Sequence, residues 1–241
     1  MRIVVSSRAV WYAAVGALLA VGAPTGLLIV REMYAPRPIA SELSTERIAY
    51  LYVLIATAVV LAGLGFLLGR QADRLEALSE TDALTGLANR RAFRRRLKDE
   101  FARSRRYRAP VSLLMVDIDG LKRINDAEGH IVGDRIIRAV AEAIGRGLRE
   151  SDFGARWGGD EFAILAPNTS AHAAHTSAQR LVARAAEHRD AHVRRAITVS
   201  VGVATYDPAE NKYADVDALV RAADEALYRA KAAGRNRVDA A

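Results

Sequence analysis

Two pairs of acidic residues lie where the sequence predicts β-strands. Asp117 and Asp119 end the apolar stretch PVSLLMVDID, and Asp160 and Glu161 follow two glycines in RWGGDEFAIL. Residues two apart in a strand face the same side, so the carboxylates of Asp117 and Asp119 are able to meet. Taken alone, this first pair is equally compatible with two solvated loop acids.

Bringing the two pairs together would create a site for a cation. Strand alternation sends Asp160 and Glu161 to opposite sides unless the turn twists one of them out. Asp117 and Asp160 converge if the hairpin after the glycines lies beside the strand of Asp117. Neighbouring carboxylates raise one another's pKa unless a cation neutralises them, and Mg²⁺ prefers oxygen ligands. The pattern therefore favours a Mg²⁺ site, with Mn²⁺ as an alternative, that also holds substrate phosphates.

Alternating helices and strands surround these acids and indicate one α/β (α+β) domain over residues 81–241. The predicted elements are helices within 88–108, 121–148, 177–187 and 214–238, strands at 110–119 and 196–206, and a hairpin at 153–165 with Gly-Gly at its turn. The first of these helices carries many arginines outside its buried ridge. A solvated or lipid-facing surface accounts for them better than nucleic-acid binding does.

Residues 1–70 differ in kind from the rest of the chain. The segments 9–30 and 48–69 contain no charged residue, have basic flanks, and are about as long as the roughly 20 residues that cross a bilayer as a helix. A cleaved signal peptide is the alternative for the first segment, but the segment is long and has no clear A-x-A site. We therefore predict a transmembrane hairpin of two helices, followed by a helical linker at 71–80.

Composition narrows the function less than the motifs do. The chain has no cysteine, which excludes disulfides and thiolate metal sites. Its formal net charge of +7 would suit nucleic acid, anionic lipid or a polyphosphate ligand. The histidine pairs at 172/175 and 188/192 have the spacing of metal ligands on a helix, but no further ligand accompanies them, so we interpret them as solvated residues.

Four stretches resemble successive motifs of one family: DALTGLANRR (82–91), DIDGLKRINDAEGHIVGD (117–134), RESDFGARWGGDEF (149–162) and ALYRAKAAGRNRV (226–238). Together they resemble the GGDEF domain of diguanylate cyclases, over Thr81–Val238. The resemblance implies a fold like the palm of nucleotidyl cyclases and polymerases, with a central, mainly antiparallel sheet flanked by helices. It also implies a homodimer in which the 3′-hydroxyl of one GTP attacks the α-phosphate of the other, twice, giving cyclic di-GMP and two pyrophosphates.

The resemblance assigns roles to the acids found above. Asp117 and Asp160, with the carbonyl of Ile118, correspond to the metal ligands. Glu161 corresponds to the acid implicated in a second metal or in activating the 3′-hydroxyl. The positions that correspond to the GTP-binding set are Asn125 and Asp134 for guanine, Gly158 and Gly159 at the turn, and Lys122, Lys231 and Arg235 for phosphates.

A separate site is implied for the product. Arg149 and Asp152 match the family's RxxD inhibitory motif just upstream of the hairpin, and Arg180 is a candidate helper. An ordinary surface pair is the alternative, because RxxD spacing is common. Leu121 and Trp157 depart from the residues usual in the family, and we expect them to tune the pocket while activity is retained.

These features favour an active diguanylate cyclase anchored in a bacterial inner membrane by two spans. Because GTP is cytoplasmic, the catalytic domain and both termini are expected in the cytoplasm, and the positive-inside rule slightly favours the same orientation. The expected partners are GTP, cyclic di-GMP, membrane lipid and a second copy of the chain, with no nucleic acid. The alternative is a catalytically inactive effector that binds cyclic di-GMP through Arg149 and Asp152.

Overall fold

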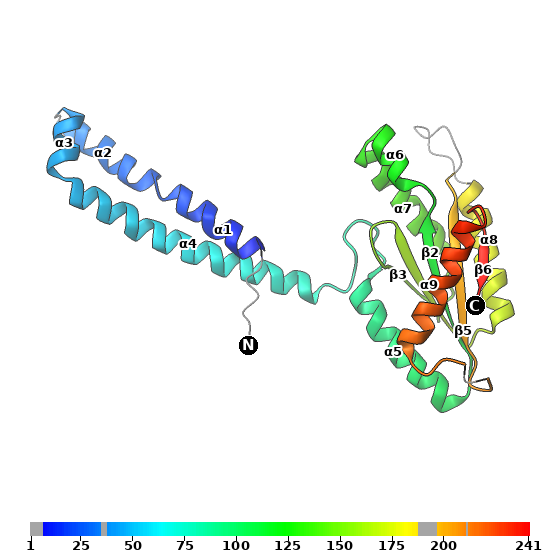
Figure 1. The fold of residues 1–241 in the computed structure, drawn as a ribbon. Coiled ribbons are helices and arrows are strands. Elements are labelled where there is room, and N and C mark those ends of the chain that lie inside the picture. The colour runs from blue at the N-terminus through cyan, green and yellow to red at the C-terminus, as the bar shows by residue number, and fades with distance from the viewer. Residues whose placement is uncertain (1–6, 35–37, 188–196, 211) are drawn as a thin grey trace. The chain divides into compact units, whose positions relative to one another are not determined.

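The computed structural model describes residues 7–34, 38–187, 197–210 and 212–241. Its internal contacts divide the chain into two compact units, Met1–Ser79 and Glu80–Ala241. Figure 1 traces the helices of the first unit and the mixed α/β fold of the second. Each unit is considered by itself below.

The first unit is helical throughout its described part, with helices α1 (Ser7–Leu19), α2 (Gly22–Tyr34), α3 (Ile39–Thr45) and α4 (Arg47–Leu78). The first predicted span, 9–30, falls on two consecutive helices, because a turn at Ala20 and Val21 separates α1 from α2. Pro24 explains the break. It lacks the N–H that would bond to the carbonyl of Ala20, four residues earlier, and its ring crowds that carbonyl.

Helices α1 and α4 pack with their backbones in close contact. A Cβ atom at Gly16 would collide with the carbonyl of Leu61, and one at Gly65 would collide with the carbonyl of Tyr12. Small residues that allow such an approach are typical of helix pairs in membranes. The segments Arg8–Tyr34 and Arg47–Arg74 are long and apolar enough to cross a membrane. Their outer surfaces expose large apolar side chains, among them Trp11, Leu18, Val59, Val60 and Leu67.

The second unit is built on a six-stranded sheet of order β1-β3-β4-β2-β5-β6. Its strands are β1 (Ala88–Asn89), β2 (Val111–Ile118), β3 (Phe153–Arg156), β4 (Glu161–Pro167), β5 (Val199–Tyr206) and β6 (Val238–Ala240). The four central strands are antiparallel neighbours, but β1–β3 and β5–β6 pair in parallel. The sheet is therefore mixed, and the predicted antiparallel arrangement holds only for its centre.

Helices cover both faces of this sheet (Figure 1). Side chains of α6 (Leu121–Glu128), α7 (His130–Gly147) and α8 (Ala171–Glu187) pack on one face, and those of α5 (Arg90–Tyr107) and α9 (Val216–Ala232) pack on the other. Every residue of β2 is buried as a result. That burial explains why the strand before the first acid pair is apolar on both faces, with Ser112 as its one polar residue before Asp117.

Local caps set where several helices begin. Asn89 accepts a hydrogen bond from the backbone N–H of Ala92 at 3.0 Å and starts α5, and Asp215 accepts one from Ala218 at 2.7 Å and starts α9. Helix α8 begins at Ala171, earlier than the predicted 177. The edge strands β1 and β6 were not predicted, because two or three residues give too short a pattern.

Candidate functional site

The predicted acids meet at one end of the two central strands. Asp117 near the end of β2 lies directly opposite Glu161 at the start of β4, and the N–H of Ile118 donates to the carbonyl of Asp160 at 3.1 Å. The hairpin thus lies beside β2, as the convergence of the acids required. Opposed residues of paired strands project from the same face. We call Asp117, Asp160 and Glu161 the acidic site.

Asp117 is buried in this arrangement, and burial disfavours its charged form. Its side chain is only 10% exposed. Burial raises the pKa of Asp117 to about 6, and the charges of Asp160 and Glu161 add to the rise, although Lys231 opposes it. The Nζ atom of Lys231 lies 2.7 Å from Oδ2 of Asp117. Lys231, predicted as a phosphate contact, is therefore the counter-ion of the buried acid in this structure.

The donor chemistry of the acidic site fits a hard cation. Asp117, Asp160, Glu161 and the carbonyl of Ile118 offer only oxygen ligands, which Mg²⁺ prefers. The ammonium of Lys231 neutralises these carboxylates only in part, since the pKa of Asp117 stays raised beside it. Across the described residues, no group of three or more His, Cys, Asp or Glu side chains has the arrangement of a finished metal site. The fit therefore rests on charge and ligand type.

Asp119 has a different position from the one its sequence pattern suggested. Instead of meeting Asp117, its carboxylate accepts hydrogen bonds from the hydroxyls of Thr198 at 2.8 Å and Ser200 at 2.7 Å, and from the backbone N–H of Asn236 at 3.0 Å. Asn236 belongs to the turn after α9, where Arg235 also has a left-handed backbone. Asp119 thus fastens the turn that carries Arg235 to the ends of β2 and β5.

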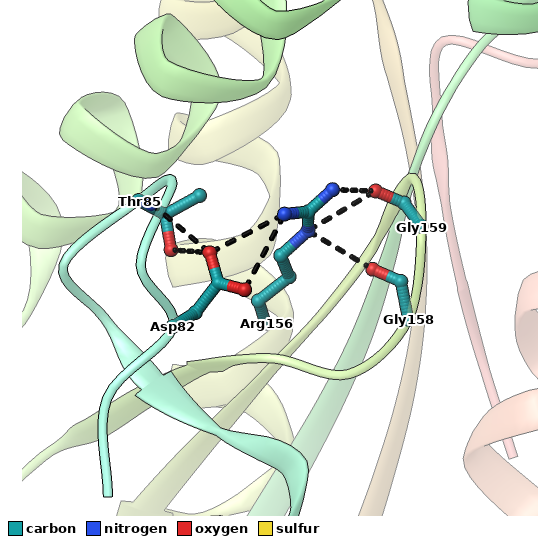
Figure 2. A network of polar contacts seen from close by, with 5 residues as sticks. All are labelled: Asp82, Thr85, Arg156, Gly158 and Gly159. Atoms are coloured by element: carbon teal, nitrogen blue, oxygen red, sulfur yellow. Dashed lines mark hydrogen bonds and ion pairs between the residues drawn. The ribbon is translucent and has the colours of Figure 1, made fainter. Parts of the chain in front are cut away.

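Arg156, to which the family motifs assigned no role, holds the Gly158–Gly159 turn in place (Figure 2). The Nε atom of Arg156 donates to the carbonyls of Gly158 and Gly159, each at 3.2 Å, and Nη2 donates to that of Gly159 at 2.7 Å. On its other side, Nη1 lies 3.3 Å from both carboxylate oxygens of Asp82. One guanidinium therefore connects the turn to the loop that follows the first unit in sequence.

Asp82 is itself held in place by Thr85. The backbone N–H and the hydroxyl of Thr85 donate to Oδ1 of Asp82 at 3.0 and 2.8 Å (Figure 2). Burial opposes ionisation of Asp82, but the bonds from Thr85 and the charge of Arg156 outweigh it, so the pKa of Asp82 is lowered from its usual value. The pair is stable in its charged form and keeps the turn in one place.

The two glycines of the turn differ in the space around them. Neither has a positive φ, so backbone freedom does not explain them. A Cβ atom at Gly158 would lie 3.0 Å from Oε2 of Glu161, whereas one at Gly159 would meet nothing within 4 Å. Gly158 therefore leaves room for the carboxylate of Glu161, and Gly159 leaves an open approach to the backbone.

The predicted guanine-binding pair stands on two adjacent helices. Asn125 lies on α6, and its side-chain Oδ1 atom is buried without a hydrogen-bond partner among the described residues. Asp134 lies on α7 beside Gly133, where a Cβ atom would collide with that same Oδ1. Gly133, which sequence reasoning missed, thus makes room for the amide of Asn125. The third predicted contact on these helices, Lys122, is exposed on α6.

The three residues predicted for the product lie in one cavity on the other face of the sheet. A cavity of about 240 Å³ is lined by Arg149, Asp152 and Arg180, and also by Arg184. Its apolar floor includes Leu114, three residues before Asp117 on β2 and hence on the opposite face. We call this cavity, with its four charged residues, the arginine cavity.

Comparison with known proteins agrees with this geometry. The sequence profile of the family described as "Diguanylate cyclase, GGDEF domain" matches residues 79–237.

The chain belongs to the GGDEF family.

Its GGDEF region is 42% identical over 164 residues to diguanylate cyclase DgcP of Pseudomonas aeruginosa, an alignment that covers 67% of this chain and 24% of that protein. It is 39% identical over 175 residues to probable diguanylate cyclase DgcC of Escherichia coli, covering 70% of this chain and 45% of that protein. The chain thus spans less than half the length of these curated relatives.

A solved structure gives the same result for the fold. The GGDEF domain of DgcB from Caulobacter crescentus, in complex with c-di-GMP, matches with a TM-score of 0.61 and 38% identity. The match covers 67% of this chain and 92% of that one. The α/β fold with a mixed sheet is therefore the fold of GGDEF domains.

Two further features of this GGDEF domain lie beside the turn. The guanidinium of Arg90 lies 4.5 Å from the ring centre of Trp157, a cation–π contact. Burial and the charge of Glu161 raise the pKa of Asp224 on α9, and Arg90 opposes that rise. Glu161 therefore has a second acidic neighbour that no motif pointed to.

The predicted histidine pairs form no metal site among the described residues. His172 and His175 are on α8 without a metal-binding group, and His188 and His192 lie outside the described residues.

Proposed function

We propose that this chain is a diguanylate cyclase that joins two GTP molecules into cyclic di-GMP. In each of two rounds, the 3′-oxygen of one GTP forms a bond to the α-phosphorus of the other, and pyrophosphate leaves with the electrons of the broken bond. The proton of the hydroxyl passes to a base. The observation that carries the proposal is the meeting of Asp117, Asp160 and Glu161 beside an open Gly-Gly turn in a GGDEF domain.

The residues of the acidic site and the glycine turn each have a proposed role in this reaction. A divalent cation bound by Asp117, Asp160 and the Ile118 carbonyl would neutralise developing charge on the phosphates. Glu161 would take the hydroxyl proton, and its position over Gly158 and beside Asp224 supports this role. Gly159 lets the nucleotide approach the backbone.

Recognition of the base and phosphates falls to the neighbouring helices. The carboxylate of Asp134 can accept from the N1–H and the amino group of guanine, and the amide of Asn125 can both donate and accept. The unpartnered Oδ1 of Asn125 supports this role, since a buried polar atom needs a partner. Lys122, Lys231 and Arg235 supply positive charge for the triphosphate.

The reaction requires two copies of the domain, because each copy holds one of the two GTP molecules. Product bound in the arginine cavity, through Arg149, Asp152 and Arg180, would inhibit further turnover. The c-di-GMP complex of the Caulobacter relative supports binding of this nucleotide by the fold. The two long apolar helices before residue 79 support anchoring in a membrane, with the GGDEF domain on the cytoplasmic side where GTP is found.

The proposal is tested by product analysis on the full chain in lipid nanodiscs. Incubation with GTP and Mg²⁺ should yield cyclic di-GMP and two pyrophosphates for each cyclic dinucleotide, and removal of the metal with EDTA should stop the reaction. The 71–241 fragment, dimerised through a fused coiled coil, should give the same product. Absence of pyrophosphate and of cyclic dinucleotide from both preparations, with cyclic di-GMP binding retained, would instead establish a non-catalytic effector.

A further inference from the structure

A fourth charged residue lines the arginine cavity and has no counterpart in the RxxD motif. Arg184 lies one helical turn after Arg180 on α8, and both line the cavity together with Arg149 and Asp152. Residues four apart on a helix lie on the same face, so both α8 guanidiniums can serve one ligand. The cavity is therefore lined from two sides, by α8 and by the turn after α7.

The charges of the cavity are not balanced within the chain. Arg149, Arg180 and Arg184 face a single carboxylate, that of Asp152, which gives a formal charge of +2. Within the described residues, the guanidiniums of Arg149 and Arg184 make no ion pair or hydrogen bond, and that of Arg180 donates only to the hydroxyl of Ser177 at 3.1 Å. The carboxylate of Asp152 accepts from the backbone N–H of Arg149 at 2.9 Å. This excess positive charge suits an anion with two phosphate charges.

The guanidinium of Arg184 lies close to a glycine across the cavity. Gly147, the last residue of α7, also lines the cavity, and a Cβ atom there would lie 3.1 Å from Nη1 of Arg184. A larger residue at this position would push the guanidinium away by a few tenths of an ångström. The neighbouring Arg146 differs, because its Nη2 atom is paired with Glu142 at 2.6 Å.

We propose that Arg184 is a further ligand-binding residue of the arginine cavity, and that Gly147 is its positioning residue. The ligand is an anionic dinucleotide, whose phosphate or guanine edge the guanidinium would contact by charge-assisted hydrogen bonds. The inference rests on the proposed binding of cyclic di-GMP in this cavity and adds a determinant of its affinity. It requires no part of the acidic site.

The test is a calorimetric titration of cyclic di-GMP into the full chain in detergent. Arg184→Ala should weaken binding about tenfold to 100-fold, the range for a hydrogen bond to a charged group, and Arg184→Lys should recover part of the loss. Arg146→Ala, a matched change of a paired arginine nearby, should leave the affinity unchanged. Initial rates of GTP turnover should be the same in all of these variants.

The glycine gives a second, independent readout. Gly147→Ala should weaken binding by displacing the guanidinium, but it should have no further effect when combined with Arg184→Ala. The inference alone fails if the wild-type chain binds cyclic di-GMP, Arg149→Ala weakens that binding, and Arg184→Ala stays within twofold of wild type. If the wild-type chain binds no cyclic di-GMP, the proposed product site fails together with the inference.

Discussion

The acidic site and the arginine cavity lie on opposite faces of one sheet and have opposite electrostatic needs. Asp117 is buried, and its pKa is raised to about 6 in a setting where Lys231 is its ion-pair partner. The guanidiniums of the arginine cavity have almost no partners within the described residues. The first region therefore needs a cation and the second an anion. Under the proposed function, charge would distinguish a substrate that binds with a metal ion from a product that binds alone.

The backbone supports the two regions in different ways. The acidic site depends on long-range ties: Arg156 reaches Asp82 across 74 residues, and Asp119 joins β5 to the turn after α9. The arginine cavity depends on short-range spacing, since Arg149 and Asp152 share one turn and Arg180 and Arg184 share one helix. Changes far from the acidic site should therefore disturb it more readily than they disturb the cavity.

We expect the largest effect from Asp160→Ala, which should abolish GTP turnover without changing the affinity for cyclic di-GMP. Asp160→Ala removes a carboxylate of the acidic site, so GTP turnover should fall by more than about 100-fold through lost metal binding. Calorimetric affinity for cyclic di-GMP should be unchanged. Asp126→Ala, which removes an exposed acid on α6, serves as the control and should leave turnover near wild type. Full activity of the Asp160→Ala variant would remove that residue from the site.

The Arg149→Ala change should weaken binding in the arginine cavity and leave the acidic site unaffected. Arg149→Ala removes a cation whose guanidinium has no partner in the described structure, so folding should be little affected. The affinity for cyclic di-GMP should fall about tenfold to 100-fold, and the initial rate of turnover should stay near normal. Progress curves would then remain linear to higher product concentration. An unchanged inhibition curve would show that the RxxD residues are not used.

The sequence predicted which residues lie in the two regions but not the contacts within them. The apolar run before Asp117 predicted a strand ending in an acid, and the family resemblance pointed to Arg149 and Asp152. The ion pair between Lys231 and Asp117 has no local pattern, since it depends on how α9 packs against the sheet. The same holds for the contact of Arg156 with Asp82.

Two local features of the structure had signals in the sequence. Pro24 in the first apolar segment predicts a helix break, and the structure has it. Strand alternation suggested that Asp119 could meet Asp117, but β2 ends at Ile118. Beyond the end of a strand, alternation no longer fixes the partner of a side chain. Arg184 follows Arg180 at a helical spacing that the sequence shows, whereas Gly133 follows no pattern that sequence alone makes visible.

A smaller effect, on KM for GTP, is expected from a change at Gly133 beside the proposed guanine-binding residues. Gly133→Ala places a Cβ atom where Oδ1 of Asn125 lies, so the amide must move, and KM for GTP should rise about tenfold, the cost of one hydrogen bond. Gly145→Ala on the same helix meets nothing within 4 Å and is the matched control. Both variants should keep the wild-type melting temperature or exceed it, because alanine favours a helix. Equal KM values would exclude this role of Gly133.

The smallest expected effect concerns stability and its pH dependence. The folded-state pKa of Asp82 is lowered from 3.8, so its contribution to stability is present above about pH 4 and is lost as the pH falls through the folded value. Asp82→Asn should therefore reduce the free energy of unfolding by about 1 kcal/mol at pH 7. Denaturation curves of variant and wild type should converge at low pH. A difference that grows on acidification would contradict the assigned sign.

The measurement that tests the two-region account most directly is the dependence of GTP turnover on added cyclic di-GMP at several GTP concentrations. Two separate sites predict a measurable rate without product, and an inhibition that lowers the maximal rate and persists at saturating GTP. Arg149→Ala should abolish that inhibition. No turnover at all, or an inhibition that saturating GTP removes, would contradict the account, because product would then act at the acidic site or there would be no reaction to inhibit.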